Sequence, residues 1–197
     1  MKMNKTIRNV VIALALSAVP TLASAQWQNA TATYKTDNTS TVKLQRGTKN
    51  AYGFLNLYGD KNFDFESMYG EARVRKSFGK GFAVGAEYNG GIGVRDILRP
   101  QVSYTKQVGP IFLDAKFSPI ETSRKLGSQL GIYASTNYKA LGLEGWVDLD
   151  YKSGKITPSG ELEGSFKIAK DLSVVVRGEK YPWQNPPEFS TGIKLNL

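Results

Sequence analysis

Residues 82–91 read FAVGAEYNGG, and large apolar side chains alternate in this stretch with small or polar ones. Phe82, Val84 and Tyr88 share one face of an extended strand, while Glu87 lies on the other face. A strand with this pattern separates an apolar environment from a polar one. The apolar face meets either a protein core or lipid, and in the second case Glu87 faces water inside the protein.

The same period-two alternation recurs along most of the chain. It is clear in residues 143–151, 162–168 and 189–197, where apolar side chains occupy every second position. No stretch shows a sustained helical period of apolar residues. The chain is therefore predicted to be all-β.

The connections between strands indicate the architecture. Links such as GKG, GP, ALG and KD are short, and they alternate with the longer GGIGVRDIL, SPIETSRKL, SGKITPS and YPWQNPPE. Tight turns at one end and longer loops at the other are typical of an up-and-down antiparallel transmembrane β-barrel. We expect about twelve strands, near residues 27–36, 39–47, 51–59, 65–78, 82–91, 99–108, 111–118, 127–139, 143–152, 160–169, 172–181 and 188–197.

Two alternatives remain at this point. Residues 27–47 are rich in Thr and Asn, which leaves open a ten-stranded barrel with an ordered N-terminal arm. A soluble sandwich or lipocalin-like barrel would instead pack the apolar positions inward. Lipid-facing strands are favoured because aromatic residues lie near strand ends, as in the interfacial girdles of membrane barrels. These residues are Phe78, Phe82, Tyr138, Tyr151 and Phe189.

The N-terminal segment is typical of a secretory signal peptide. A basic head precedes an apolar run over residues 10–22, and Ala23-Ser24-Ala25 forms the small-residue cleavage pattern before Gln26. We expect cleavage after Ala25 and a single barrel domain over residues 26–197. The expected location is the outer membrane of a Gram-negative bacterium.

Composition excludes several classes of function. The chain has no histidine and no cysteine, so it lacks both a disulfide framework and an imidazole for proton transfer near neutral pH. We therefore expect no enzymatic activity, no cofactor and no metal site. The formal charge of +9 is interspersed along an exported chain, so no nucleic-acid polymer is expected as a partner.

The polar positions of the strands predict the lining of a lumen. Basic and acidic residues both occur there and neither sign dominates, which suits neutral or zwitterionic solutes. For each charge or ring, pairing or space-filling inside the barrel is the simpler interpretation, with solute contact as the alternative. A constriction is expected from Glu71, Arg73, Arg75, Glu87 and Trp146. The candidate pore-lining or solute-binding residues are Phe54, Tyr58, Tyr69, Glu71, Arg73, Arg75, Glu87, Asp114, Lys116, Tyr133, Trp146, Asp148, Lys167 and Arg177.

Three stretches carry a family resemblance. FLNLYGDKNFDFESMYGEARVRKSF at 54–78, FAVGAEYNGG at 82–91 and RPQVSYTKQVGPIFLDAKFSPI at 99–120 resemble the Tsx-like outer-membrane channel proteins. That group includes nucleoside-specific channels and the OmpK barrels. The resemblance implies a twelve-stranded barrel and passive diffusion of nucleosides.

Three hypotheses follow from the sequence. The first is an outer-membrane channel for passive diffusion of small, mostly uncharged solutes, with nucleosides as candidates. The second is a non-conducting barrel that acts as a receptor or structural module, with Trp183 in the YPWQNPPEF segment as a contact. The third is a soluble periplasmic ligand carrier. The expected partners are outer-membrane lipid, small-molecule solutes and the barrel-assembly machinery during biogenesis, and the expected state is a monomer.

Overall fold

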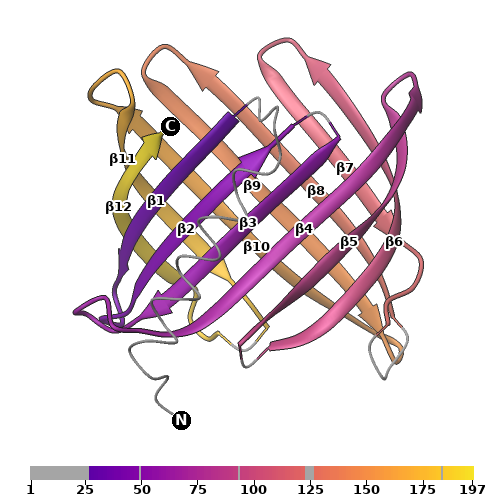
Figure 1. The fold of residues 1–197 in the computed structure, drawn as a ribbon, viewed down its shortest axis with the longest axis horizontal. Helices are drawn as coiled ribbons and strands as arrows, with labels where there is room; N and C mark the ends of the chain where they lie inside the picture. Colours follow the sequence, from indigo (N-terminus) through magenta and orange to yellow (C-terminus); the bar gives the residue numbers. More distant parts are fainter. Residues whose placement is uncertain (1–26, 49, 93, 123–126, 183) are drawn as a thin grey trace.

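A closed antiparallel β-barrel of twelve strands forms the molecule in a computed structural model (Figure 1). The structure describes residues 27–197 except 49, 93, 123–126 and 183. The expected signal peptide at 1–25 and the contact residue Trp183 lie outside the described residues. In the described part of the chain, no helix is long and apolar enough to cross a membrane.

Every strand pairs with its neighbours in the sequence, so the topology is up-and-down. This confirms the predicted all-β barrel. The strands are β1 (Trp27–Lys35), β2 (Ser40–Gly47), β3 (Ala51–Gly59), β4 (Phe65–Gly79), β5 (Phe82–Ile92), β6 (Val94–Val108), β7 (Ile111–Ser118), β8 (Gly127–Tyr138), β9 (Leu141–Lys152), β10 (Lys155–Lys167), β11 (Leu172–Lys180) and β12 (Glu188–Asn196).

Pairing of the first and last strands closes the barrel. β1 lies antiparallel to β12, with Asn29 opposite Asn196 and Lys35 opposite Ser190. On its other side β1 pairs with β2 from Trp27 to Tyr34. The Thr- and Asn-rich N-terminal segment is therefore part of the wall, and the ten-stranded alternative is wrong.

Two expected loops are largely strand. β6 begins at Val94 and not near residue 99, and β10 begins at Lys155 and not near residue 160. The β9–β10 connection is a two-residue turn of Ser153 and Gly154, both with positive φ, which matches the twist of a hairpin. These segments contain glycine, proline and charged residues, as loops often do. The backbone hydrogen bonds of the sheet nevertheless tolerate these residues here.

The two ends of the barrel differ. The turns at the end that carries the C-terminus are short, and they lie at the top of the view in Figure 1. The opposite end carries the longer connections β3–β4, β7–β8 and β11–β12, together with the short β1–β2 turn and the tight β5–β6 and β9–β10 hairpins. The expected contrast between the two ends thus holds for three of the six connections at the loop end.

The apolar positions point outward on most strands. Val84 is 48% exposed and Val174 is 42% exposed, whereas Glu87 is 1% and Arg177 is 3% exposed. Among the described residues, the buried apolar side chains are Leu57, Ala83 and Val175. Many more buried side chains are polar or charged. The barrel therefore has a polar interior and an apolar outer wall, which is the arrangement of a membrane barrel.

Candidate functional site

The barrel interior encloses a cavity of about 1360 Å³. All twelve strands contribute residues to its wall. The wall includes Asp60, in the β3–β4 loop, and Asn50, in the β2–β3 turn at the opposite end. The cavity therefore extends between the two ends of the barrel.

Most of the sequence-predicted residues lie on this wall. Twelve of the fourteen candidates do so: Phe54, Tyr58, Tyr69, Glu71, Arg73, Arg75, Glu87, Asp114, Lys116, Tyr133, Trp146 and Asp148. Arg177 is buried beside the cavity within an ion-pair cluster. Their roles in solute contact, and the expected constriction, stay predictions.

The structure corrects the placement of Lys167. This residue is exposed at the last position of β10, and it is absent from the described cavity wall. Its place in the alternation is that of an inward residue. At the rim, however, the strand ends and an inward position meets solvent, so alternation no longer predicts contact with the lumen.

Carboxylates outnumber basic groups along the cavity. Of the described residues on the wall, twelve are acidic and seven are basic. Five of the acidic residues lie at the loop end: Asp37, Asp60, Glu66, Glu179 and Glu188. The balanced lining expected from the sequence is thus an acidic one, because the loop-end residues add to the acids on the strands.

Glu87 is the centre of one ion-pair network. Its carboxylate accepts a hydrogen bond from Lys116 Nζ at 2.8 Å and another from Arg99 Nη1 at 3.4 Å. Arg99 also donates to Glu121 at 3.2 Å. Lys116 reaches past β8 to Asp148, with 3.6 Å between the charged atoms. These contacts tie β5, β6 and β7 to β9 through side chains.

A glycine makes that reach possible. Gly131 lies on β8 directly between Lys116 and Asp148 in the strand register. A side chain there would overlap both the lysine stem and the aspartate carboxylate. The missing Cβ therefore opens the space in which the Lys116–Asp148 pair forms.

A second set of ion pairs crosses between strands that are not neighbours. Arg73 on β4 donates to both carboxylate oxygens of Asp114 on β7, at 3.0 and 3.1 Å. Arg75 donates to the same carboxylate at 3.1 Å. A forked contact of this kind fixes both partners in direction as well as distance. The pair therefore forms a bridge across the concave inner surface.

A third cluster joins β9 to β12. Lys194 donates to Glu144 at 2.5 Å and to Glu163 at 3.0 Å. Tyr133 donates to Glu144 at 2.9 Å from β8. Lys43 on β2 reaches Glu161 on β10 at 3.3 Å. The basic groups of the interior thus point at carboxylates and hold the wall in shape.

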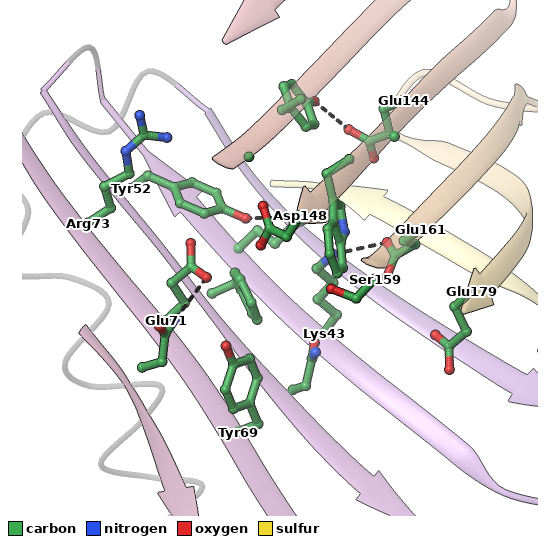
Figure 2. Close-up of a pocket in the computed structure, with 18 of the residues that line it drawn as sticks. Lys43, Tyr52, Tyr69, Glu71, Arg73, Glu144, Asp148, Ser159, Glu161 and Glu179 are labelled. Atoms are coloured by element: carbon green, nitrogen blue, oxygen red, sulfur yellow. Dashed lines mark hydrogen bonds and ion pairs between the residues drawn. The ribbon is translucent and has the colours of Figure 1, made fainter. Parts of the chain in front are cut away.

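An aromatic row lies on β3 and β4. The ring centroids of Tyr52 and Phe54 are 5.9 Å apart, and those of Phe54 and Tyr69 are 5.7 Å apart. The Lys43 ammonium lies 5.2 Å from the centre of the Phe54 ring. Figure 2 shows Tyr52 and Tyr69 on one side of the cavity and the carboxylates of Glu144 and Asp148 on the other. The cavity wall thus combines an aromatic surface with hydrogen-bond acceptors.

Sequence reasoning missed two interior residues. Arg99 was assigned to the start of a strand and was not a candidate, although it contacts Glu87, Glu121 and Asn89. Lys35 forms ion pairs with Glu179 and Glu188 at the loop end and was also missed. Counting by twos from other inward positions, such as Gln101 in β6 or Thr33 in β1, finds both.

In the part of the chain that the structure describes, no group of three or more His, Cys, Asp or Glu residues is arranged to hold a metal ion.

Comparisons with known proteins identify the fold. No protein-family model matches the chain. No curated protein matches it either. Among solved structures, the NanC porin matches with a TM-score of 0.61 at 9% identity, covering 86% of this chain and 100% of that one. The KdgM porin matches with a TM-score of 0.57 at 13% identity, covering 87% of this chain and 99% of that one.

A second structure of the KdgM porin, in complex with disordered oligogalacturonate, matches with a TM-score of 0.54, again at 13% identity. It covers 87% of this chain and 99% of that one. At these identities the likeness concerns the fold alone. The chain therefore has the fold of small twelve-stranded porin barrels.

Proposed function

We propose that the protein is an outer-membrane channel through which small, mostly uncharged solutes diffuse passively, with nucleosides as candidates. One observation carries this proposal: a cavity of about 1360 Å³ reaches both ends of a barrel whose outer wall is apolar. Barrels of eight strands are filled by side chains and those of sixteen or more leave wide channels, so twelve strands suit a narrow pore.

The same wall supports a membrane location. Exposed valine, leucine, isoleucine and aromatic side chains cover the outside of most strands. Such a surface is stable in lipid and prone to aggregation in water. Together with the predicted signal peptide, it supports the outer membrane of a Gram-negative bacterium. The soluble carrier is disfavoured for this reason.

The charge of the lining bears on the solute. The KdgM porin has been solved in complex with oligogalacturonate, which carries a carboxylate on each sugar. The cavity of this chain has twelve acidic and seven basic residues on its described wall. Rings of like charge repel solutes of the same sign, so acidic oligosaccharides are disfavoured here. Most basic groups are also already paired with a carboxylate.

The aromatic row supports nucleosides. A base that stacks on Tyr52, Phe54 or Tyr69 gains about 1–3 kcal/mol by analogy with stacking on single-stranded nucleic acid. Carboxylates on the opposite side of the cavity, such as Glu144 and Asp148, are positioned to accept hydrogen bonds from ribose hydroxyls (Figure 2). The resemblance of residues 54–120 to the Tsx-like channels supports the same solute class.

A non-conducting barrel is the second candidate. It is favoured by the ion pairs that cross between distant strands, such as Arg73–Asp114 and Lys43–Glu161, because these side chains occupy part of the interior. A barrel held in this way would serve as a receptor or structural module.

One pair of measurements separates the candidates. The refolded barrel is placed in planar bilayers for single-channel recording and in liposomes for a swelling assay. Uridine, sucrose and trigalacturonate are compared side by side in the swelling assay. We expect discrete current steps and faster entry of uridine than of trigalacturonate. Absence of current steps together with absence of swelling would show that the barrel does not conduct. Current steps with preferred entry of trigalacturonate would contradict the proposed solute class.

A further inference from the structure

A groove of about 460 Å³ lies on the outer wall of the barrel, over β8 to β11. Its sides are apolar, and its residues are opposite one another in the strand register. One row runs Thr136, Leu143, Gly164 and Val176, and the next runs Tyr138, Leu141, Phe166 and Val174. These rows belong to the outward face, because Leu143, Phe166 and Val174 are exposed.

Gly164 creates the depression. It occupies an outward position between the larger Leu162 and Phe166 on β10. A Cβ added there would meet one atom within 4 Å, the backbone oxygen of Val176 at 4.0 Å. Leu143 and Val176 flank it on the neighbouring strands. The notch between them is therefore a gap in the apolar wall that nothing in the backbone fills.

Positive charge gathers at the short-turn end of the groove. Lys139 lies in the β8–β9 turn, and its ammonium is 5.4 Å from the ring centre of Tyr138, which lines the groove. Lys167 ends β10 and Lys170 lies in the β10–β11 turn. A hydrogen bond of 2.8 Å from the Lys167 backbone N–H to the Ala140 carbonyl joins the end of β10 to the β8–β9 turn.

These three lysines differ from those of the interior. All three are exposed, and among the described residues none forms an ion pair. The one exposed acid beside them is Asp171, which follows Lys170 in the same turn. The interior lysines Lys43 and Lys116, by contrast, each contact a carboxylate. The turn cluster thus presents a net positive charge to whatever lies at the membrane surface.

We propose that this groove and its lysine cluster bind an anionic phospholipid. The acyl chain would lie in the notch over Gly164, and the phosphate of the headgroup would lie between Lys139, Lys167 and Lys170. Tyr138 fits the same arrangement, because aromatic residues prefer the boundary between lipid tails and headgroups. The short turns of outer-membrane barrels face the periplasm, so the lipid belongs to the periplasmic leaflet. A lysine near a membrane surface attracts anionic lipid, and three act together here.

This inference rests on the membrane location proposed above and not on conduction. A barrel that passes no current and still binds the lipid leaves it standing. Native mass spectrometry of the refolded full chain in detergent provides the test. Dioleoylphosphatidylglycerol is compared with dioleoylphosphatidylcholine, which has the same chains and no net charge. We expect about tenfold greater retention of the phosphatidylglycerol.

Matched variants identify the site. The triple variant K139Q/K167Q/K170Q is expected to abolish the preference for phosphatidylglycerol. The control variant K76Q/K80Q/K106Q removes three exposed lysines from β4 to β6 at the same end and is expected to keep it. Gly164→Leu fills the notch with a side chain that the wall has room for, and is expected to lower retention of both lipids.

Three results would overturn the proposal. The first is equal retention of the two lipids by the unchanged protein. The second is an equal loss of preference in the control triple variant, which would indicate attraction by the whole rim. The third is displacement of the lipid by glycerophosphoglycerol at the same concentration, which would show that the headgroup alone binds and the groove contributes nothing.

Discussion

Arg177 donates two hydrogen bonds to one oxygen of the Glu163 carboxylate, from Nε at 3.1 Å and from Nη2 at 2.5 Å. The two residues are opposite each other on β11 and β10, and both are almost completely buried. Lys194 donates to the second oxygen of Glu163 at 3.0 Å. Both oxygens of this buried carboxylate are therefore satisfied by basic groups, and the wall is stable locally because all three side chains are present.

Removing Arg177 should destabilise the barrel strongly. Arg177→Met leaves the buried Glu163 with one basic partner, and we expect the free energy of unfolding to fall by about 3 kcal/mol. Urea unfolding of the barrel refolded in phosphatidylcholine vesicles measures this. Lys155→Gln, an exposed change at a turn, serves as the control and should lie within about 0.5 kcal/mol of the unchanged protein. If R177M unfolds like that control, the pair has no structural role.

A lysine on the outer wall should be poorly tolerated. Val147 is 50% exposed in the middle of β9 and points to lipid in the proposed location. Val147→Lys places a charge in hydrocarbon, which lowers the free energy of unfolding by about 2–4 kcal/mol near the bilayer midplane. Ser159→Lys, on the cavity wall beside Asp148, should change it much less. Equal effects of the two variants would contradict the assignment of the inner and outer faces.

The aromatic row should contribute to nucleoside binding. Phe54 contacts both Tyr52 and Tyr69, so Phe54→Ala disrupts the whole row. Loss of one stacking surface weakens binding by about 1–3 kcal/mol. The measurement is the concentration of uridine that half-blocks single-channel current. Phe117→Ala removes an outward ring of the same size and should leave the blocking concentration unchanged.

The acidic lining should make the pore prefer cations. Twelve acidic and seven basic residues on the described wall concentrate K⁺ over Cl⁻. The reversal potential in a KCl gradient reports this preference. Asp148→Asn should reduce the permeability ratio by about twofold, and Arg75→Gln should raise it, because each changes one charge in a narrow lumen. Anion preference in the unchanged protein would contradict a lumen potential set by the surplus of carboxylates.

The β3–β4 loop should depend on the charge of Asp60. Hydrogen bonds from the backbone N–H groups of Asp64, at 3.0 Å, and of Asn62, at 2.8 Å, lower the pKa of the Asp60 carboxyl. Because this pKa is depressed in the folded loop, the stabilisation is complete above the ordinary aspartate pKa and is lost as the pH falls through the lowered value. Carbon-13 NMR of the Asp60 carboxyl in the refolded protein measures the titration. A midpoint at or above the ordinary value would contradict these hydrogen bonds.

The fold was predictable because each strand separates two environments. FAVGAEYNGG and the other alternating stretches have apolar side chains at every second position. A helix, or a strand buried on both faces, does not show this pattern. The starts of β6 and β10 were missed because Gly93 and Pro158 resemble loop residues. Pro158 lies within β10 opposite Leu149, on the same outward face as the exposed Ile156 and Leu162. Alternation therefore predicted the central part of each strand better than the extensions of β6 and β10.

The site was predictable in part. Alternation placed residues such as Phe54, Glu87 and Trp146 on the inner face, where the structure has them. It failed at Lys167, where the strand ends at the rim. It could not predict that Arg73 contacts Asp114, because that contact joins β4 to β7 and depends on how the strands stagger around the closed barrel.

The contact of Lys116 with Asp148 across the Gly131 position has a consequence for engineering. Individual polar side chains occupy the interior, and a packed apolar core does not. The width of the lumen can therefore be changed one residue at a time, while the backbone hydrogen bonds of the sheet and the apolar outer wall stay unchanged. Trimming the crossing bridges would widen the bore, and enlarging Gly131 would narrow it. A short, histidine- and cysteine-free shell of this kind is a natural starting point for a nanopore sensor.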